Sequence, residues 1–208
     1  MSIILNSDTI FILLFILITY GENLKKTFFL IEYGCLKNNK LIFLTSLKLR
    51  PTKNIIKKSL YSWIIYYINS LYIIDFFSGT GIICFNLFSN GAKKIIMLEQ
   101  NKLFFKYINL NKIKLNLYNN FFIYLFDSMI WLKNLNILNV SLIIIDPPYI
   151  YNLYNFLLQL NAIFFLKKYL LIFLETNKHL FFKNYFLDIF LLKKKQSGQT
   201  KFYFLKKI

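Results

Sequence analysis

The chain has 208 residues, which suits one domain with a sizeable core, and no shift in composition marks a second domain. Its 26 Lys and Arg against nine Asp and Glu give a formal net charge of +17. That charge favours RNA, DNA or an anionic membrane as partner, although an AT-rich genome would also produce this excess of Lys, Asn, Ile and Phe. Two cysteines (Cys35, Cys84) and one histidine (His179) lack metal-ligand spacing, which excludes a zinc site or disulfide scaffold and favours a reducing cytoplasm.

The N-terminal segment carries the most apolar run, Ile10–Tyr20, which is shorter than the roughly 20 residues that span a bilayer. No basic region precedes it, so it makes a poor signal peptide. We interpret residues 1–27 as a divergent apolar extension, and a membrane-associated protein remains the alternative.

Residues 28–208 are predicted to form the main domain. Within it, the weak alternation over 27–43 predicts a hairpin in a 28–48 extension, followed by a core over 49–208. Arg50-Pro-Thr52 predicts the start of a helix that runs through Trp63, with Thr52 as its N-cap.

From residue 71 onward, short apolar runs recur, and each is closed by an acid. Runs of this length without alternation are typical of parallel strands covered on both faces, and the segments 101–117 and 151–167 are long enough for crossover helices. The pattern predicts an α/β doubly wound sheet whose carboxyl ends carry these acids, where ligands bind in such folds. The five acids are Asp75, Glu99, Asp127, Asp146 and Glu175.

Two further strands are predicted near the end of the chain, over 185–192 and 201–207, with a turn at 196–199. They would add an antiparallel hairpin to a mostly parallel sheet.

The stretch Asp75-Phe-Phe-Ser-Gly-Thr-Gly81 leaves a strand and enters a helix. Glycines there allow close backbone approach to a ligand, and the amides at the helix start offer hydrogen-bond donors. Glu99 closes the next strand, where a carboxylate can accept both hydroxyls of a ribose. Together these features predict a nucleoside site.

Asp146-Pro-Pro-Tyr149 follows another apolar run. The prolines stiffen the backbone, so the carboxylate and nearby carbonyl oxygens can hold the N–H groups of an exocyclic amine and aim its lone pair at an electrophile. Tyr149 supplies a flat face for a splayed base. This stretch predicts amine chemistry on a nucleobase.

The order D-x-F-S-G-T-G, acid, acid, D-P-P-Y resembles class I S-adenosylmethionine-dependent methyltransferases that act on amino groups. More narrowly, residues 28–208 resemble the RsmD family of 16S ribosomal RNA guanine-N2 methyltransferases. Three segments carry this likeness: Leu49-Arg-Pro-Thr52 with Leu60-Tyr-Ser-Trp63, Asp75 through Asn90-Gly-Ala92, and Gln196-Ser-Gly-Gln-Thr200.

The resemblance implies a Rossmann-like fold, S-adenosylmethionine as cofactor, and 16S ribosomal RNA or the small subunit as partner of a monomeric enzyme without metal. The methionine end of the cofactor would contact Asp75, Ser78, Gly79 and Gly81, its ribose Glu99, and its adenine Asp127. The target amine would meet Asp146, Pro147, Pro148 and Tyr149. The RNA would face Arg50, Thr52, Lys57, Lys37 and Lys40.

The chain departs from the family pattern at Ile55, Lys58, Cys84 and Asn86. Two rival functions stay open, because the D-P-P-Y chemistry serves any exocyclic amine and because a basic surface can be retained without catalysis. One is a DNA adenine-N6 methyltransferase, which is disfavoured because the chain has no room for a DNA target-recognition domain. The other is an eroded enzyme retained as an RNA-binding or ribosome-assembly protein.

Overall fold

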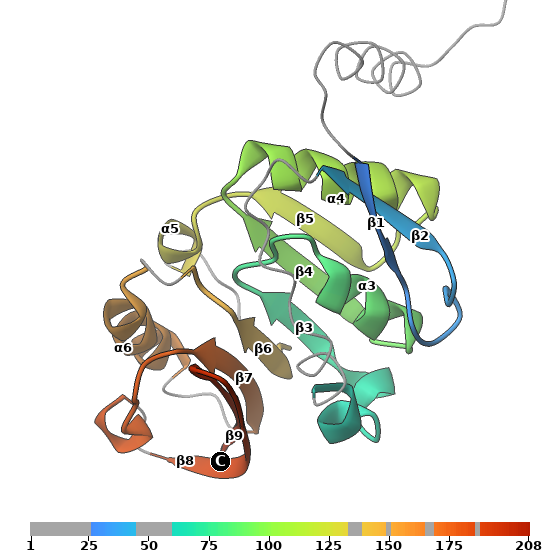
Figure 1. Ribbon diagram of the computed structural model, residues 1–208. Coiled ribbons are helices and arrows are strands. Elements are labelled where there is room, and N and C mark those ends of the chain that lie inside the picture. The colour runs from blue at the N-terminus through green and yellow to red at the C-terminus, as the bar shows by residue number, and fades with distance from the viewer. Residues whose placement is uncertain (1–25, 45–59, 133–138, 149–150, 165–168, 186–187) are drawn as a thin grey trace, which may run out of the picture.

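The computed structural model describes residues 26–44, 60–132, 139–148, 151–164, 169–185 and 188–208 (Figure 1). The apolar N-terminal run, the start of the Arg50-Pro-Thr52 helix and Tyr149 lie outside these residues. Of the predicted helix through Trp63, residues 60–64 are described, and they are helical. The single-turn helix η1, Ile68–Ser70, follows and leads into the sheet.

A seven-stranded sheet in the order β5-β4-β3-β6-β7-β9-β8 forms the centre of the protein (Figure 1). Its parallel part consists of β3 (Tyr72–Asp75), β4 (Lys94–Glu99), β5 (Phe121–Leu125), β6 (Leu142–Ile145) and β7 (Leu170–Thr176). All four residues of β6 are buried, as a strand covered on both faces requires. The predicted α/β sheet is confirmed.

The C-terminal hairpin closes the sheet at one edge. β9 (Thr200–Lys207) pairs antiparallel with β7, and β8 (Ile189–Ser197) pairs antiparallel with β9. The predicted bounds of the first strand and of the turn were wrong. Ser197 pairs with Thr200, so the turn holds two residues and the strand continues through the lysines that precede it.

Helices cover both faces of the sheet. α3 (Ile82–Ser89) and α4 (Lys102–Lys114) pack on one face, where Phe85 and Ile108 join Ile95 and Phe121 in one core cluster. α5 (Ser128–Leu132) and α6 (Leu153–Phe164) pack on the other, with Phe156 among its buried residues. A second single-turn helix, η2 (Phe182–Asn184), lies between β7 and β8. The helices α4 and α6 confirm the two predicted crossovers.

A two-stranded sheet of β1 (Lys26–Leu30) and β2 (Lys40–Leu44) lies against α3 and α4 (Figure 1). It confirms the predicted N-terminal hairpin. Buried Leu41 and Phe43 contribute to the core beneath it.

Side-chain amides from the two helices hold this hairpin. The Asn111 side chain of α4 accepts from the Ile42 N–H at 2.8 Å and donates to the Ile42 carbonyl oxygen at 3.0 Å. The Asn86 side chain of α3 accepts from the Glu32 N–H at 2.8 Å. Because Asn86 and Asn111 are buried, water cannot replace these bonds without cost.

We expect Asn111→Ala to reduce the free energy of unfolding by about 1–3 kcal/mol, because it leaves the Ile42 N–H and carbonyl without partners. Urea unfolding measures this loss, and amide hydrogen exchange at Ile42 should become faster. Asn119→Ala, in an exposed turn, is the matched control and should leave both quantities unchanged. Equal behaviour of the two variants would contradict the role of Asn111.

Candidate functional site

The five acids predicted to close strands all lie at the carboxyl edge of the parallel sheet. Asp75 and Glu99 are the last residues of β3 and β4, and Asp146 directly follows β6. Asp127 lies two positions beyond β5, and Glu175 is next to last in β7. The chain order reverses between β3 and β6, which is where open α/β sheets bind ligands.

The turn after β3 is shaped by two glycines with left-handed backbone angles, Gly79 at φ 53° and Gly81 at φ 68°. A Cβ placed on Gly79 would meet no atom within 4 Å, so the backbone here borders open space. Gly81 is the N-cap of α3, whose first amides therefore point toward the same edge of the sheet. The turn can thus accept a ligand close to its main chain.

Glu99 clamps this turn. Its Oε2 accepts from the Gly79 N–H and its Oε1 from the Asn101 N–H, both at 2.7 Å. Burial raises the pKa of Glu99, while the N–H groups of Asn101, Gly79 and Gln100 act in the opposite direction. Each carboxylate oxygen retains a further lone pair with which it can accept a ligand hydroxyl.

Asp75 is buried beneath the same turn. Its Oδ2 accepts from the Cys84 thiol at 3.2 Å and its Oδ1 from the Phe77 N–H at 3.1 Å. Burial raises the pKa of Asp75 to about 7, and the charges of Asp146 and Glu99 act in the same direction, whereas the bonds from Cys84 and Phe77 lower it. The site therefore holds a carboxyl group that gains from a nearby cation.

Asp127 caps α5, because its Oδ1 accepts from the Met129 N–H at 2.8 Å and from the Ile130 N–H at 3.3 Å. Tyr151 lies between this cap and the glycine turn. Its ring meets that of Phe77 edge to face, with centroids 4.8 Å apart, and its hydroxyl is buried without a hydrogen bond. Burial, with a contribution from Asp127, raises the pKa of Tyr151 to about 12.

The stretch after β6 brings Asp146 into electrostatic range of Asp75, so the acid predicted to hold an amine lies near the acid of the glycine turn. Pro147 is half-buried and Pro148 is exposed, and the carbonyl of Pro148 accepts from the Tyr151 N–H at 2.8 Å. Tyr149 lies outside the described residues, so its stacking role stays a prediction.

The residues predicted to face RNA are not all near this edge. Arg50, Thr52 and Lys57 lie outside the described residues. Lys37 and Lys40 are exposed, but they belong to the end of the hairpin that meets the last turns of α3 and α4. Contacts with Ser89 and Lys114 place that end at the amino edge of the sheet, away from the acids (Figure 1).

Among the residues that the structure describes, no group of three His, Cys, Asp or Glu side chains could hold a metal ion. No helix in the described part of the chain is both long and apolar enough to cross a bilayer.

Comparison with known proteins shows which family the chain belongs to. The family described as "Conserved hypothetical protein 95" matches residues 30–206. The chain belongs to this family. Its relatives include proteins named "Ribosomal RNA small subunit methyltransferase D", which confirms the resemblance to the RsmD family.

Two such relatives show how far the sequence likeness extends. The protein from Buchnera aphidicola is 34% identical over 116 residues, which cover 56% of this chain and 60% of the relative. The protein from Haemophilus influenzae is 38% identical over 69 residues, 33% of this chain and 36% of the relative. Both alignments span less than two thirds of the curated relatives' own length.

Solved structures share the fold. The candidate methyltransferase yhhF from Escherichia coli has a TM-score of 0.71 at 18% identity, covering 87% of this chain and 98% of that one. P. horikoshii TYW2, solved in complex with MeSAdo, has a TM-score of 0.60 at 13% identity, covering 81% of this chain and 68% of that one. The chain therefore shares the fold of these proteins.

Sequence reasoning missed several contributors to this site and its support. Cys84 and Asn86 were noted only as departures from the family pattern, yet Cys84 bonds Asp75 and Asn86 holds the hairpin. Tyr151 and Ser128, whose hydroxyl donates to the Phe76 carbonyl, were not singled out. The one available signal was that Cys84 and Asn86 share a helix that starts at the glycine turn.

We expect Asp75→Asn to remove a pH dependence of stability. The folded state keeps a proton on Asp75 up to about pH 7, whereas the unfolded chain releases it near 3.8, so this group's contribution falls as pH rises between those values. Relative to the variant, the free energy of unfolding of the wild type should fall by on the order of 2 kcal/mol between pH 5 and pH 8. Urea unfolding at the two pH values measures this change. Asp188→Asn, at an exposed acid, is the control. Parallel curves for wild type and Asp75→Asn would show that Asp75 is ionised throughout.

Proposed function

We propose that the protein transfers a methyl group from S-adenosylmethionine to the exocyclic N2 amine of a guanine in small-subunit ribosomal RNA. The observation that carries this proposal is the meeting of the glycine turn with Asp75 and the Asp146-Pro-Pro stretch. They follow β3 and β6, the adjacent strands at which the sheet order reverses. The names of the RsmD-type relatives support ribosomal RNA as substrate.

The residues at this edge fit the cofactor. S-adenosylmethionine carries a positively charged sulfonium and ammonium, and the carboxyl groups of Asp75, Glu99 and Asp146 converge here although the chain as a whole has a net charge of +17. The open space beside Gly79 leaves room for the methionine part of the molecule. Ser78 lies buried in the same turn, held by its N–H bond to the Leu98 carbonyl at 3.1 Å.

The amine site follows from the same geometry. When bound, the cofactor supplies an electrophilic methyl group. Asp146, at the end of a fully buried strand, would accept an N–H bond from the guanine amine and orient the nitrogen lone pair toward that group. Pro147 and Pro148, which directly follow Asp146, limit backbone movement next to this contact.

Two rival functions are separated by simple measurements. An eroded RNA-binding protein would not bind S-adenosylmethionine, and the buried bonds of Cys84 and Asn86 support a retained fold at the positions that depart from the family pattern. A DNA adenine methyltransferase would label duplex DNA. Incubation with labelled cofactor and unmethylated small subunits, followed by mapping of the label, tests the proposed substrate directly.

We expect Asp146→Ala to lower the methyl-transfer rate at least about 100-fold, because the amine is no longer oriented. Isothermal titration should show an unchanged dissociation constant for S-adenosylmethionine. Asp146→Asn keeps one acceptor oxygen, so its methyl-transfer rate should lie between those of the wild type and Asp146→Ala. Normal turnover by Asp146→Ala would remove this residue from the amine site.

We expect Glu99→Ala to weaken cofactor binding by roughly 10- to 100-fold, because it removes both the clamp on Gly79 and the acceptors for the ribose hydroxyls. Glu99→Gln retains one acceptor oxygen and should lose less. A dissociation constant equal to that of the wild type in Glu99→Ala would exclude the ribose role.

A further inference from the structure

The charges of the protein are separated between the two edges of the parallel sheet. The five strand-closing acids lie at the carboxyl edge, whereas lysines gather at the amino edge, where β4 and β5 begin and α4 ends. We call them the amino-edge lysines: Lys40, Lys93, Lys94, Lys112 and Lys114. Within the described ranges, no ion pair joins any of them to a carboxylate.

Two of these lysines share one aromatic ring. The Nζ of Lys94 lies 5.2 Å from the ring centroid of Phe122, and the Nζ of Lys112 lies 5.8 Å from the same centroid. Burial lowers the pKa of Lys112. Two ammonium groups brought to one ring repel each other, so a bound anion would stabilise this arrangement.

The lysines continue on both sides of this pair. On one side, the Nζ of Lys114 donates to the Lys40 carbonyl at 2.7 Å, which joins the end of α4 to the hairpin. On the other side, the Nζ of Lys93 lies 5.3 Å from the ring centroid of Tyr72. The band therefore runs from the hairpin across α4, β5 and β4 to the first residue of β3.

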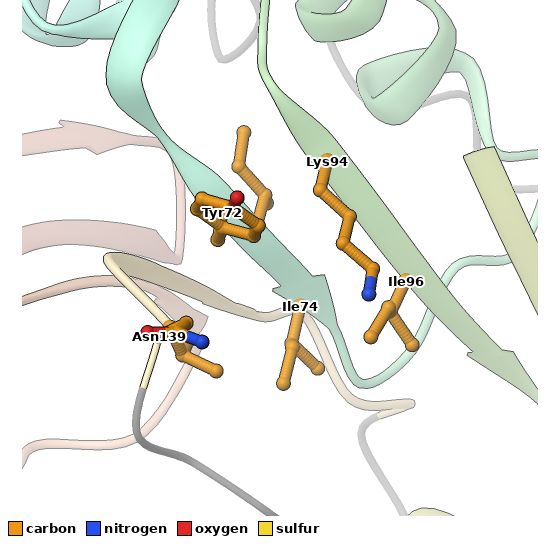
Figure 2. Close-up of a pocket in the computed structure, with 7 residues that line it drawn as sticks. Tyr72, Ile74, Lys94, Ile96 and Asn139 are labelled. Carbon is orange, nitrogen blue, oxygen red and sulfur yellow. The ribbon is translucent and has the colours of Figure 1, made fainter. Parts of the chain in front are cut away.

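A hollow of about 270 Å³ opens where the band reaches β3. Figure 2 shows Tyr72 and Ile74 from β3 beside Lys94 and Ile96 from β4, with Asn139 across from them. An aromatic ring, an ammonium group and a side-chain amide thus border one concave surface. These are groups that stack on a base, contact a phosphate and hydrogen-bond a base edge.

We propose that the amino-edge lysines and Tyr72 form a second RNA-contact surface, on which substrate phosphates follow the lysines and an unstacked base lies against Tyr72. This inference rests on the proposed function as an RNA-modifying enzyme and extends it to the edge opposite the transfer site. RNA is favoured over an acidic protein because aromatic rings alternate with the lysines along the band.

Codon bias alone does not explain this surface. Codon bias acts along the whole chain, and lysines elsewhere also lie over rings, such as Lys194 over Tyr203. At the amino edge, Lys93, Lys94 and Lys112 gather over two rings beside a hollow. The sequence of α4, with four lysines, contains no acid to balance them.

The test uses the full-length triple variant Lys93→Gln, Lys94→Gln, Lys112→Gln in fluorescence-anisotropy titrations with a small-subunit RNA fragment. We expect binding to weaken roughly tenfold or more at 0.1 M salt, and the slope of log K against log salt to fall by about 2. The dissociation constant for S-adenosylmethionine should not change, because its site lies at the other edge of the sheet.

Lys193→Gln, Lys194→Gln, Lys195→Gln is the matched control, since it removes the same charge from exposed positions of β8 at the far side of the sheet. An equal loss in both triple variants would show that only net charge matters and would overturn the proposal. The proposal would also be overturned if polyglutamate displaced RNA equally well from the wild type and from the amino-edge variant.

Tyr72 supplies a test that leaves charge unchanged. We expect Tyr72→Leu to weaken RNA binding roughly tenfold and Tyr72→Phe to leave it intact, because a ring suffices for stacking. Equal RNA binding by Tyr72→Leu and Tyr72→Phe would show that no base stacks on Tyr72. If the wild type bound RNA but transferred no methyl group, the proposed function would fail, whereas these binding measurements would still decide the RNA-contact surface.

Discussion

The other parts of the site depend on the two hydrogen bonds that the Glu99 carboxylate accepts from the Gly79 and Asn101 N–H groups. It ties the end of β4 to the turn after β3, beside the main-chain hydrogen bond from the Ser78 N–H to the Leu98 carbonyl. That turn also determines where α3 begins, and α3 carries Asn86 and Ser89, which hold the hairpin. One buried carboxylate thereby connects the ligand edge of the sheet to its N-terminal extension.

The two edges of the sheet carry opposite charges, and each edge stabilises its charged groups in a different way. At the carboxyl edge, Asp75 and Glu99 are buried close together, and backbone amides and a thiol offset part of the cost of desolvation. At the amino edge, Lys94 and Lys112 rely on the face of Phe122 instead of carboxylates. The net charge of +17 is therefore unevenly distributed, and the acids at the carboxyl edge form an anionic end that suits a cationic ligand.

Much of the sheet could be predicted because strands buried on both faces must be apolar throughout, as in β6. The bounds of β8 could not, since almost all its side chains are exposed and Lys193–Lys195 look like a solvated turn. The closeness of Asp75 and Glu99 at one edge of the sheet could be predicted because each acid closes a strand, but the hydrogen bond from Cys84 depends on packing across the turn. The position of Lys37 and Lys40 depends on how the hairpin docks, which local patterns do not encode.

The Asn111 amide binds both main-chain polar groups of a single residue, Ile42, and so acts as a register pin for the hairpin. A shift of β2 by one residue would move Leu41 and Phe43 out of the core. The residue then opposite Asn111 would direct its N–H and carbonyl away from the Asn111 amide. The connection over residues 31–39 is constrained as well, because Ile31 is buried in the core and a Cβ on Gly34 would clash with the Ser89 carbonyl of α3. Insertions or deletions there must therefore be absorbed before β2 begins. Related hairpins that keep an amide at this helical position should conserve the strand register.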